Sequence, residues 1–130
     1  DDAKYIVVLM GAWSGDAKEA VDKLRDEGYP IGVLRIRYVR PFPIEELVEV
    51  ARGKKGVLVV DRSISFGNAG PLFIEVSSAL TEVNVALKGV LAGIGGVDVG
   101  VDDFVEIFKK FINEAEEYGT FIKRQEWYLR

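Results

Sequence analysis

Apolar residues along this chain form short continuous runs, separated by stretches in which they recur every three or four positions. Continuous runs of this length, rich in Val, Ile and Leu, are typical of strands buried on both faces of a parallel sheet. The last run alternates less cleanly than the others but has the same length. The pattern therefore predicts four strands, at Tyr5–Met10, Ile31–Val39, Gly56–Asp61 and Val83–Leu91.

The intervening stretches predict four helices, which start at Ser14, Pro43, Pro71 and the pair Asp102 and Asp103. Ser and Asp are good N-caps, and Pro is favoured at the first helical position. Two buried stripes follow from the helical spacing. The second helix has Ile44, Leu47, Val48 and Ala51, and the fourth has Phe104, Phe108, Phe111, Ile112 and Ala115.

Strands that alternate with helices favour an α/β fold, and we expect three layers, α/β/α, around a mostly parallel sheet. No linker or low-complexity segment interrupts the series, so residues 1–130 are predicted to form one domain. The last residues, TFIKRQEWYLR, show no clear period. Their aromatic side chains need a surface to pack on, which we expect to lie outside this chain: Phe121, Trp127 and Tyr128.

The amino-acid composition limits the kinds of chemistry that this chain can perform. The 130 residues include 17 basic and 21 acidic side chains, a net charge of −4, and no long basic run, which argues against nucleic-acid binding. With no Cys and no His, the chain has no disulfide, no thiol nucleophile and no imidazole base or ligand. The longest apolar runs are far below the roughly 20 residues of a membrane span. A soluble protein is expected, and the first residue, Asp1, suggests a piece of a longer protein or a processed end.

The loops that follow the strands are the expected ligand sites of such a fold. In the third loop, polar residues and then glycines precede a helix N-terminus, which suits a carboxylate or phosphate. The alternative is a long turn in which Arg62 pairs with a nearby acid. The candidates are Asp61, Arg62, Ser63, Ser65, Gly67, Asn68 and Gly70 in this loop, with Gly93, Gly95 and Gly96 as a second possible anion loop.

Several familiar motifs are excluded. The segment GAWSG has neither the glycine spacing of a dinucleotide site nor the Gly-Lys-Ser/Thr of a P-loop. It also places Ser14 one position late for a nucleophile elbow, and no His is present to activate it. Asp98, Asp102 and Asp103 lack the spacing of a calcium loop, so no metal site is predicted.

The segment RPFP, residues 40–43, is unusually stiff. Pro41 and Pro43 fix φ on either side of Phe42 and push the preceding residues towards extended geometry. Arg40 and Phe42 are therefore held in set directions before the second helix begins. One interpretation is that they are presented to another surface; the other is that Phe42 packs on this domain's own core and Arg40 is solvated.

Taken together, GVLRIRYVRPFPIEEL, VLVVDRSISFGNAGPLFIEVSSAL, GIGGVDV and the closing EWYLR resemble one family. The chain is similar to the C-terminal domain, domain II, of the α chain of 2-oxoacid:ferredoxin oxidoreductases, most closely the pyruvate enzymes (pyruvate synthase). The resemblance implies a domain like the C-terminal domain of transketolase. It also implies an antiparallel edge strand ahead of the first strand seen here, and we expect this sequence to begin too late to contain it.

The resemblance further implies a cytoplasmic, multisubunit enzyme that converts a 2-oxoacid and CoA to acyl-CoA, CO₂ and reduced ferredoxin. Such enzymes use thiamine diphosphate, Mg²⁺ and iron-sulfur clusters. This sequence has no Cys for a cluster and no segment of the thiamine diphosphate type, so no catalytic residue and no bound cofactor is assigned to it. The low counts of Met, Gln and Asn would suit a thermophile.

Two functions remain open beside each other. In the first, Arg40, Phe42 and the loop after the third strand form a face that docks on the rest of the α chain or on a neighbouring subunit. In the second, the glycine loops bind an anion or CoA, and the domain is a regulatory module. A stand-alone flavodoxin-like or receiver domain is disfavoured, because Met10 and Gly11 stand where a receiver needs acidic residues.

Overall fold

The computed structural model describes residues 3–9, 14–35, 44–62, 71–81, 83, 85–92, 100–118 and 123–127. Nine elements follow one another along the chain, strand and helix alternating. They are β1 (Tyr5–Leu9), α1 (Ser14–Asp26), β2 (Ile31–Arg35), α2 (Ile44–Ala51), β3 (Gly56–Arg62), α3 (Pro71–Ala79), β4 (Ala86–Ala92), α4 (Val101–Tyr118) and β5 (Lys123–Trp127).

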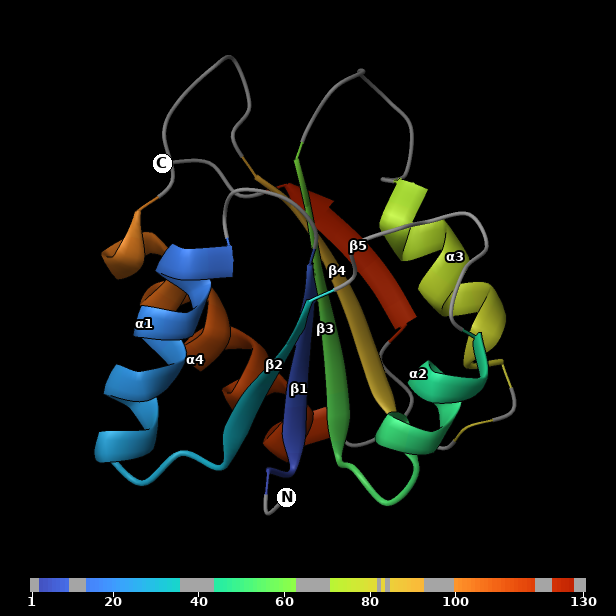
Figure 1. Ribbon diagram of the computed structural model, residues 1–130, viewed down its shortest axis with the longest axis horizontal. Helices are drawn as coiled ribbons and strands as arrows, with labels where there is room; N and C mark the ends of the chain where they lie inside the picture. The colour runs from blue at the N-terminus through green and yellow to red at the C-terminus, as the bar shows by residue number, and fades with distance from the viewer. Residues whose placement is uncertain are drawn as a thin grey trace.

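The strands form one five-stranded sheet in the order β2-β1-β3-β4-β5, with every described pair parallel. Helices α1 and α4 cover one face and α2 and α3 cover the other (Figure 1). The expected three-layer α/β/α architecture is confirmed. Within the part of the chain that the structure describes, no helix is both long enough and apolar enough to cross a membrane.

The structure differs from the sequence prediction in the start of one strand and in one strand that was not predicted. The fourth strand begins at Ala86 rather than Val83, because residues 83 and 85 lie in a bend that leads out of α3. The second difference is β5, which pairs with β4 from Leu87↔Lys123 to Leu91↔Trp127. Its sequence, KRQEW, carries almost no apolar signal because it is an edge strand of the described sheet. The expected packing of Phe121 and Tyr128, and of the Trp127 side chain, lies outside the described residues.

Alternation of side chains along the strands divides the core in two. Tyr5, Val7 and Leu9 of β1 point towards α1 and α4, whereas Ile6 and Val8 point towards α2 and α3. All five are buried, as are Val57 to Val60 of β3. The continuous apolar runs in the sequence therefore correspond to central strands that are covered on both faces.

Helix α4 contributes the largest apolar side chains to the core. Phe104, Phe108 and Phe111 are all 1% exposed or less, and the Phe111 ring meets the Tyr5 ring edge to face, 5.9 Å between centroids. A Cβ at Gly56 would lie 2.7 Å from Phe111 Cζ and 3.2 Å from Tyr5 Cδ1. The missing side chain at the start of β3 is what lets these rings sit against the sheet.

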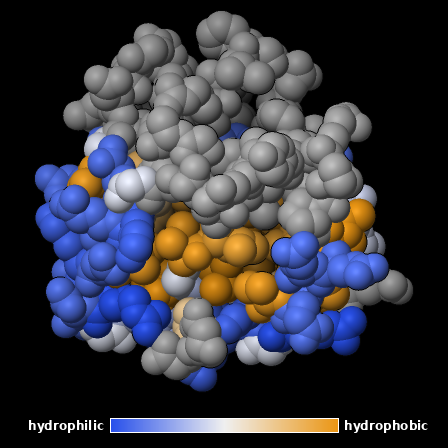
Figure 2. All heavy atoms as spheres, in the orientation of Figure 1, coloured by the Kyte–Doolittle hydropathy of each residue, from blue (hydrophilic) through white to orange (hydrophobic). Residues whose placement is uncertain are grey.

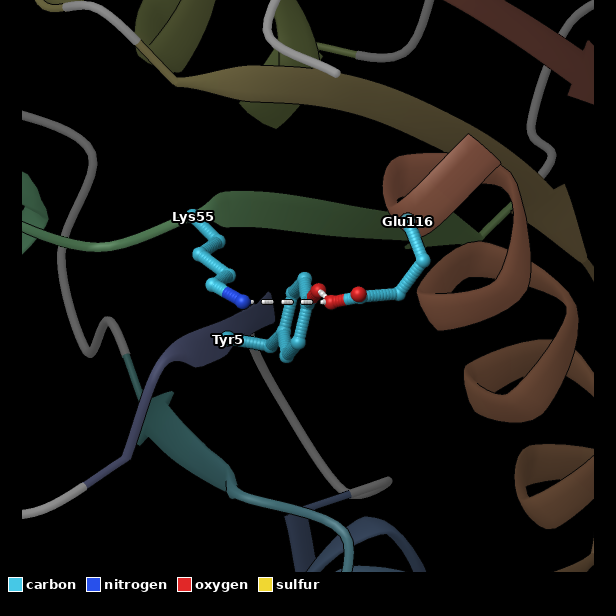
Figure 3. A network of polar contacts seen from close by, with 3 residues as sticks. All are labelled: Tyr5, Lys55 and Glu116. Carbon is cyan, nitrogen blue, oxygen red and sulfur yellow. Dashed lines mark hydrogen bonds and ion pairs between the residues drawn. The ribbon is translucent and has the colours of Figure 1, made fainter. Parts of the chain in front are cut away.

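Polar contacts hold the end of α4 to the amino edge of the sheet (Figure 3). The buried Tyr5 hydroxyl donates a hydrogen bond to Glu116, and Lys55 Nζ lies 3.5 Å from Glu116 Oε2. Burial, and then the contact with Glu116, raise the pKa of the Tyr5 hydroxyl. The hydrogen bond from Tyr5, supported by the Lys55 charge, lowers the pKa of Glu116. Both shifts stabilise the folded form near neutral pH, where tyrosine is neutral and glutamate ionised.

A second polar contact joins α4 to β4. Lys88 is 1% exposed at its side chain and pairs with Glu114, which is 15% exposed. Lys88 shares a sheet face with Ala86 and Val90, which pack towards α4. A buried ammonium is tolerated only with such a partner, so the pair fixes where α4 lies along β4.

Replacing Gly56 with alanine should destabilise the fold by roughly 1–3 kcal/mol, because the new methyl group must displace the Phe111 ring. The matched control is Gly15→Ala in the first turn of α1, where a Cβ meets nothing within 4 Å. That change should raise stability by about 0.5 kcal/mol. Denaturant titration of the chain measures both; equal effects of the two substitutions would contradict the close approach at Gly56.

Tyr5→Phe should lower the free energy of unfolding at pH 7 by about 1 kcal/mol, since it removes a hydrogen bond to a half-exposed carboxylate. The difference between wild type and variant should shrink as the pH falls below 4.5, the ordinary pKa of Glu116, because the folded-state pKa is lowered. It should also shrink as the pH rises above 10.0, the ordinary pKa of Tyr5, because the folded-state pKa is raised.

Denaturant titrations between pH 3 and pH 11 test this pH dependence. Tyr29→Phe is the control, because among the described residues its hydroxyl has no hydrogen-bond partner. A Tyr5→Phe difference that stays constant across this range would show that the Glu116 contact contributes nothing.

Candidate functional site

The carboxyl ends of the parallel strands form the expected site, and the structure places two predicted residues there. Asp61 and Arg62 are the last residues of β3, opposite Leu91 and Ala92 of β4. Because β3 lies between β1 and β4, Asp61 is at the middle of this edge. Its side chain is 6% exposed and has interaction partners within the protein. Arg62 is described as part of the strand, without its side chain.

The remaining predicted site residues lie outside the described residues and stay predictions. They belong to the segments that follow β2, β3 and β4: Arg40, Phe42, Ser63, Ser65, Gly67, Asn68, Gly70, Gly93, Gly95 and Gly96. The described strands end at Arg35, Arg62 and Ala92, and since they are parallel these ends meet at one edge of the sheet. The structure therefore brings the starts of the predicted loops to the same edge of the sheet, the one at the carboxyl ends of the strands.

One expectation about the neighbouring helix was wrong. Ile44, assigned to the buried stripe of α2, is 52% exposed and is the large hydrophobic side chain that stands out to solvent in the described part of the chain. Leu47 and Ala51 are buried as expected, and Val48 is half-buried. Helical spacing placed Ile44 on the core side, but the buried residues of α2 in the structure begin at Leu47. Ile44 directly follows the RPFP segment.

Figure 2 shows the face of the molecule on which β2 forms the outer edge of the described sheet. Apolar atoms gather in the middle of this view, between hydrophilic side chains on both sides. Val33 and Leu34 of β2 are only half-buried here. The edge strand β2 thus leaves apolar side chains incompletely covered.

The described residues provide no ligand set for the cofactors that the resemblance implies. They contain no group of three or more Cys, His, Asp or Glu side chains placed to hold a metal ion. The sequence has no Cys to ligate a cluster. Asp102 and Asp103 lie at the start of α4, where the Asp103 carboxylate accepts a hydrogen bond from the Gly100 amide, 3.0 Å. No catalytic step is assigned to this part of the chain.

A pocket of about 400 Å³ lies at the opposite end of the domain, where α2 and α3 finish. No sequence pattern predicts it, because its lining comes from two segments far apart in the chain that carry no motif. The lining residues are Val48, Arg52, Gly53, Ser78, Ala79, Thr81 and Val83.

Comparison with known proteins identifies the family. The model of "Pyruvate:ferredoxin oxidoreductase core domain II" matches residues 3–104. The ketoisovalerate oxidoreductase subunit VorA of Pyrococcus furiosus is 44% identical over 98% of this chain and 33% of its own length. The pyruvate synthase subunit PorA of Thermotoga maritima is 39% identical over 99% of this chain and 32% of its own length.

A second PorA, from Methanosarcina barkeri, is 39% identical over 96% of this chain and 32% of its own length. The chain therefore spans about a third of the length of the curated relatives that it matches. The family match covers β1 to the first turns of α4, and with it both predicted edge residues of β3. The chain belongs to the pyruvate:ferredoxin oxidoreductase core domain II family.

Proposed function

We propose that this chain is the domain II portion of the α subunit of a 2-oxoacid:ferredoxin oxidoreductase. The whole enzyme would convert a 2-oxoacid and CoA to acyl-CoA, CO₂ and reduced ferredoxin. Support comes from the family match and from relatives that are named as subunits of ketoisovalerate oxidoreductase and pyruvate synthase. Both names denote 2-oxoacids, so the proposal is made at the level of that substrate class.

Within such an enzyme, residues 1–130 would act as one α/β domain that supports assembly rather than chemistry. Thiamine diphosphate, Mg²⁺ and the iron-sulfur clusters would be held by other parts of the complex, since this sequence has no segment of the thiamine diphosphate type and no Cys for a cluster. CoA and ferredoxin would reach the complex as substrates. The cytoplasm is the proposed location.

The exposed Ile44 is the observation that carries the assembly role. Ile44 is 52% exposed and directly follows a segment stiffened by two prolines. A lone exposed aliphatic side chain is common on protein surfaces, so its support for an interface comes from its position next to this segment. The strand β2 at the sheet edge adds two half-buried apolar side chains, Val33 on the side of α1 and α4 and Leu34 on the side of α2 and α3. Arg40 and Phe42 immediately precede Ile44, and aromatic and Arg residues are the usual anchors of protein interfaces.

We therefore infer that this end of the domain docks on the remainder of the α chain or on a neighbouring subunit. The proposed interface includes Ile44, Arg40, Phe42 and the residues that follow β3, namely Arg62, Ser63, Ser65, Gly67 and Asn68. Asp61, buried at the end of β3, would hold the start of that loop in place.

Ile44→Ala should weaken assembly of the complex about tenfold, the size of a moderate interface contact. It should leave the stability of the chain itself nearly unchanged, because the side chain is half exposed. Analytical ultracentrifugation of the complex and denaturant titration of the chain measure the two effects. Lys18→Ala on the exposed surface of α1 is the control and should change neither.

Arg40→Ala, measured in the same complex, tests the stiffened segment. Assembly should fall while the specific activity of the complexes that do form stays at the wild-type level, because Arg40 is assigned no chemical role. Unchanged assembly in both the Ile44→Ala and Arg40→Ala variants would overturn the docking role.

A further inference from the structure

The pocket between the ends of α2 and α3 begins about one helical turn after Ile44, at Val48 of the same helix. Helices α2 and α3 each lead into the amino end of a strand, β3 and β4, so the pocket faces the amino edge of the sheet. Its volume, about 400 Å³, falls within the range of small-molecule sites. The residues that line the pocket carry aliphatic, hydroxyl and guanidinium groups.

The aliphatic part of the lining comes from both helices. Val48 and Ala79 are half-buried, and Val83 adds a third small apolar side chain from the turn after α3. Three small aliphatic side chains thus offer apolar contact to a short hydrocarbon chain.

The charged part is the Arg52 guanidinium. Arg52 is exposed, and no ion pair or side-chain hydrogen bond joins it to any other described residue. A guanidinium presents its N–H groups as a planar fork that matches a carboxylate. Ser78, exposed on the same wall, adds a hydroxyl donor.

Helix carboxyl ends carry partial negative charge on unsatisfied carbonyl groups, which would oppose an anion. Much of that charge is already neutralised here. The Val48 and Ala51 carbonyls accept from the Arg52 and Lys54 amides, and the Val76 carbonyl accepts from the Leu80 amide. The Ser77 and Ser78 carbonyls accept from the Thr81 hydroxyl, at 3.3 and 2.9 Å. Arg52 is the charged side chain among the residues that line the pocket.

We propose that this pocket binds a small carboxylate with a short branched aliphatic chain, the carboxylate on Arg52 and Ser78 and the chain on Val48, Ala79 and Val83. This site goes beyond the proposed function and does not depend on it, because it involves neither the docking face nor any catalytic group. A phosphate would use Arg52 but leave the aliphatic lining empty, and a neutral ligand would leave the guanidinium unpaired.

Hydrogen–deuterium exchange of the assembled protein that contains this chain tests the proposal, with 3-methylbutanoate as probe. At 50 mM probe, exchange should slow at least twofold in segments 48–55 and 78–83. The amide of the same acid, which keeps the shape and loses the charge, should have no effect.

Three variants locate the site. Arg52→Ala should abolish the protection by removing the charge, and Arg52→Lys should weaken it, because the bidentate fork is lost. Ala79→Leu should abolish the protection by filling the apolar part, with Arg52 intact. Lys18→Ala, an exposed cation on α1, should leave it unchanged.

Each of the following results would overturn the proposal. They are no protection of the two segments in the wild-type protein, equal protection in the Arg52→Ala variant, and equal protection by inorganic phosphate, which would indicate a general anion site. Protection by the amide as strong as by the acid would also contradict the role of Arg52.

Discussion

The packing of α4 against the sheet is the contact on which the rest of this structure depends. Three phenylalanine rings from one stripe of the helix are fully buried, and the one nearest the amino edge fits only because position 56 has no side chain. Helix α1 packs beside α4 on the same face, and β5 follows directly from it (Figure 1). Shifting α4 would therefore disturb a whole layer and one edge of the sheet together.

Polar contacts fix the position of α4 along the sheet, which apolar packing alone does not determine. Apolar surfaces tolerate sliding, whereas Lys88 with Glu114, and Tyr5 with Glu116, each require one register. Both pairs hold the half of α4 near the amino edge. Asp61, in contrast, lies at the carboxyl edge, where we propose that the domain contacts other parts of the enzyme.

The sequence predicted the parts of the fold that are apolar and locally periodic. Strands β1 and β3 were found because both of their faces are buried, and α4 because its phenylalanines repeat every three or four residues. Strand β5 was missed because an edge strand made of Lys, Arg, Gln and Glu has no hydrophobic pattern. Ile44 was misassigned because periodicity gives the face of a helix but not how far the sheet beneath it extends. The pocket at Arg52 depends on two helix ends that meet only in three dimensions.

Fold alone would not identify this protein, because the strand order β2-β1-β3-β4-β5 is shared with flavodoxin-like proteins of other functions. The family match carries the assignment to the pyruvate:ferredoxin oxidoreductase core domain II family, whose domain is transketolase C-terminal-like. The most direct test of the central claim is light scattering of the 130-residue chain mixed with the remainder of the α chain and its partner subunits. Tight association at a fixed stoichiometry is predicted. A chain that stays monomeric and ignores these partners would contradict the account.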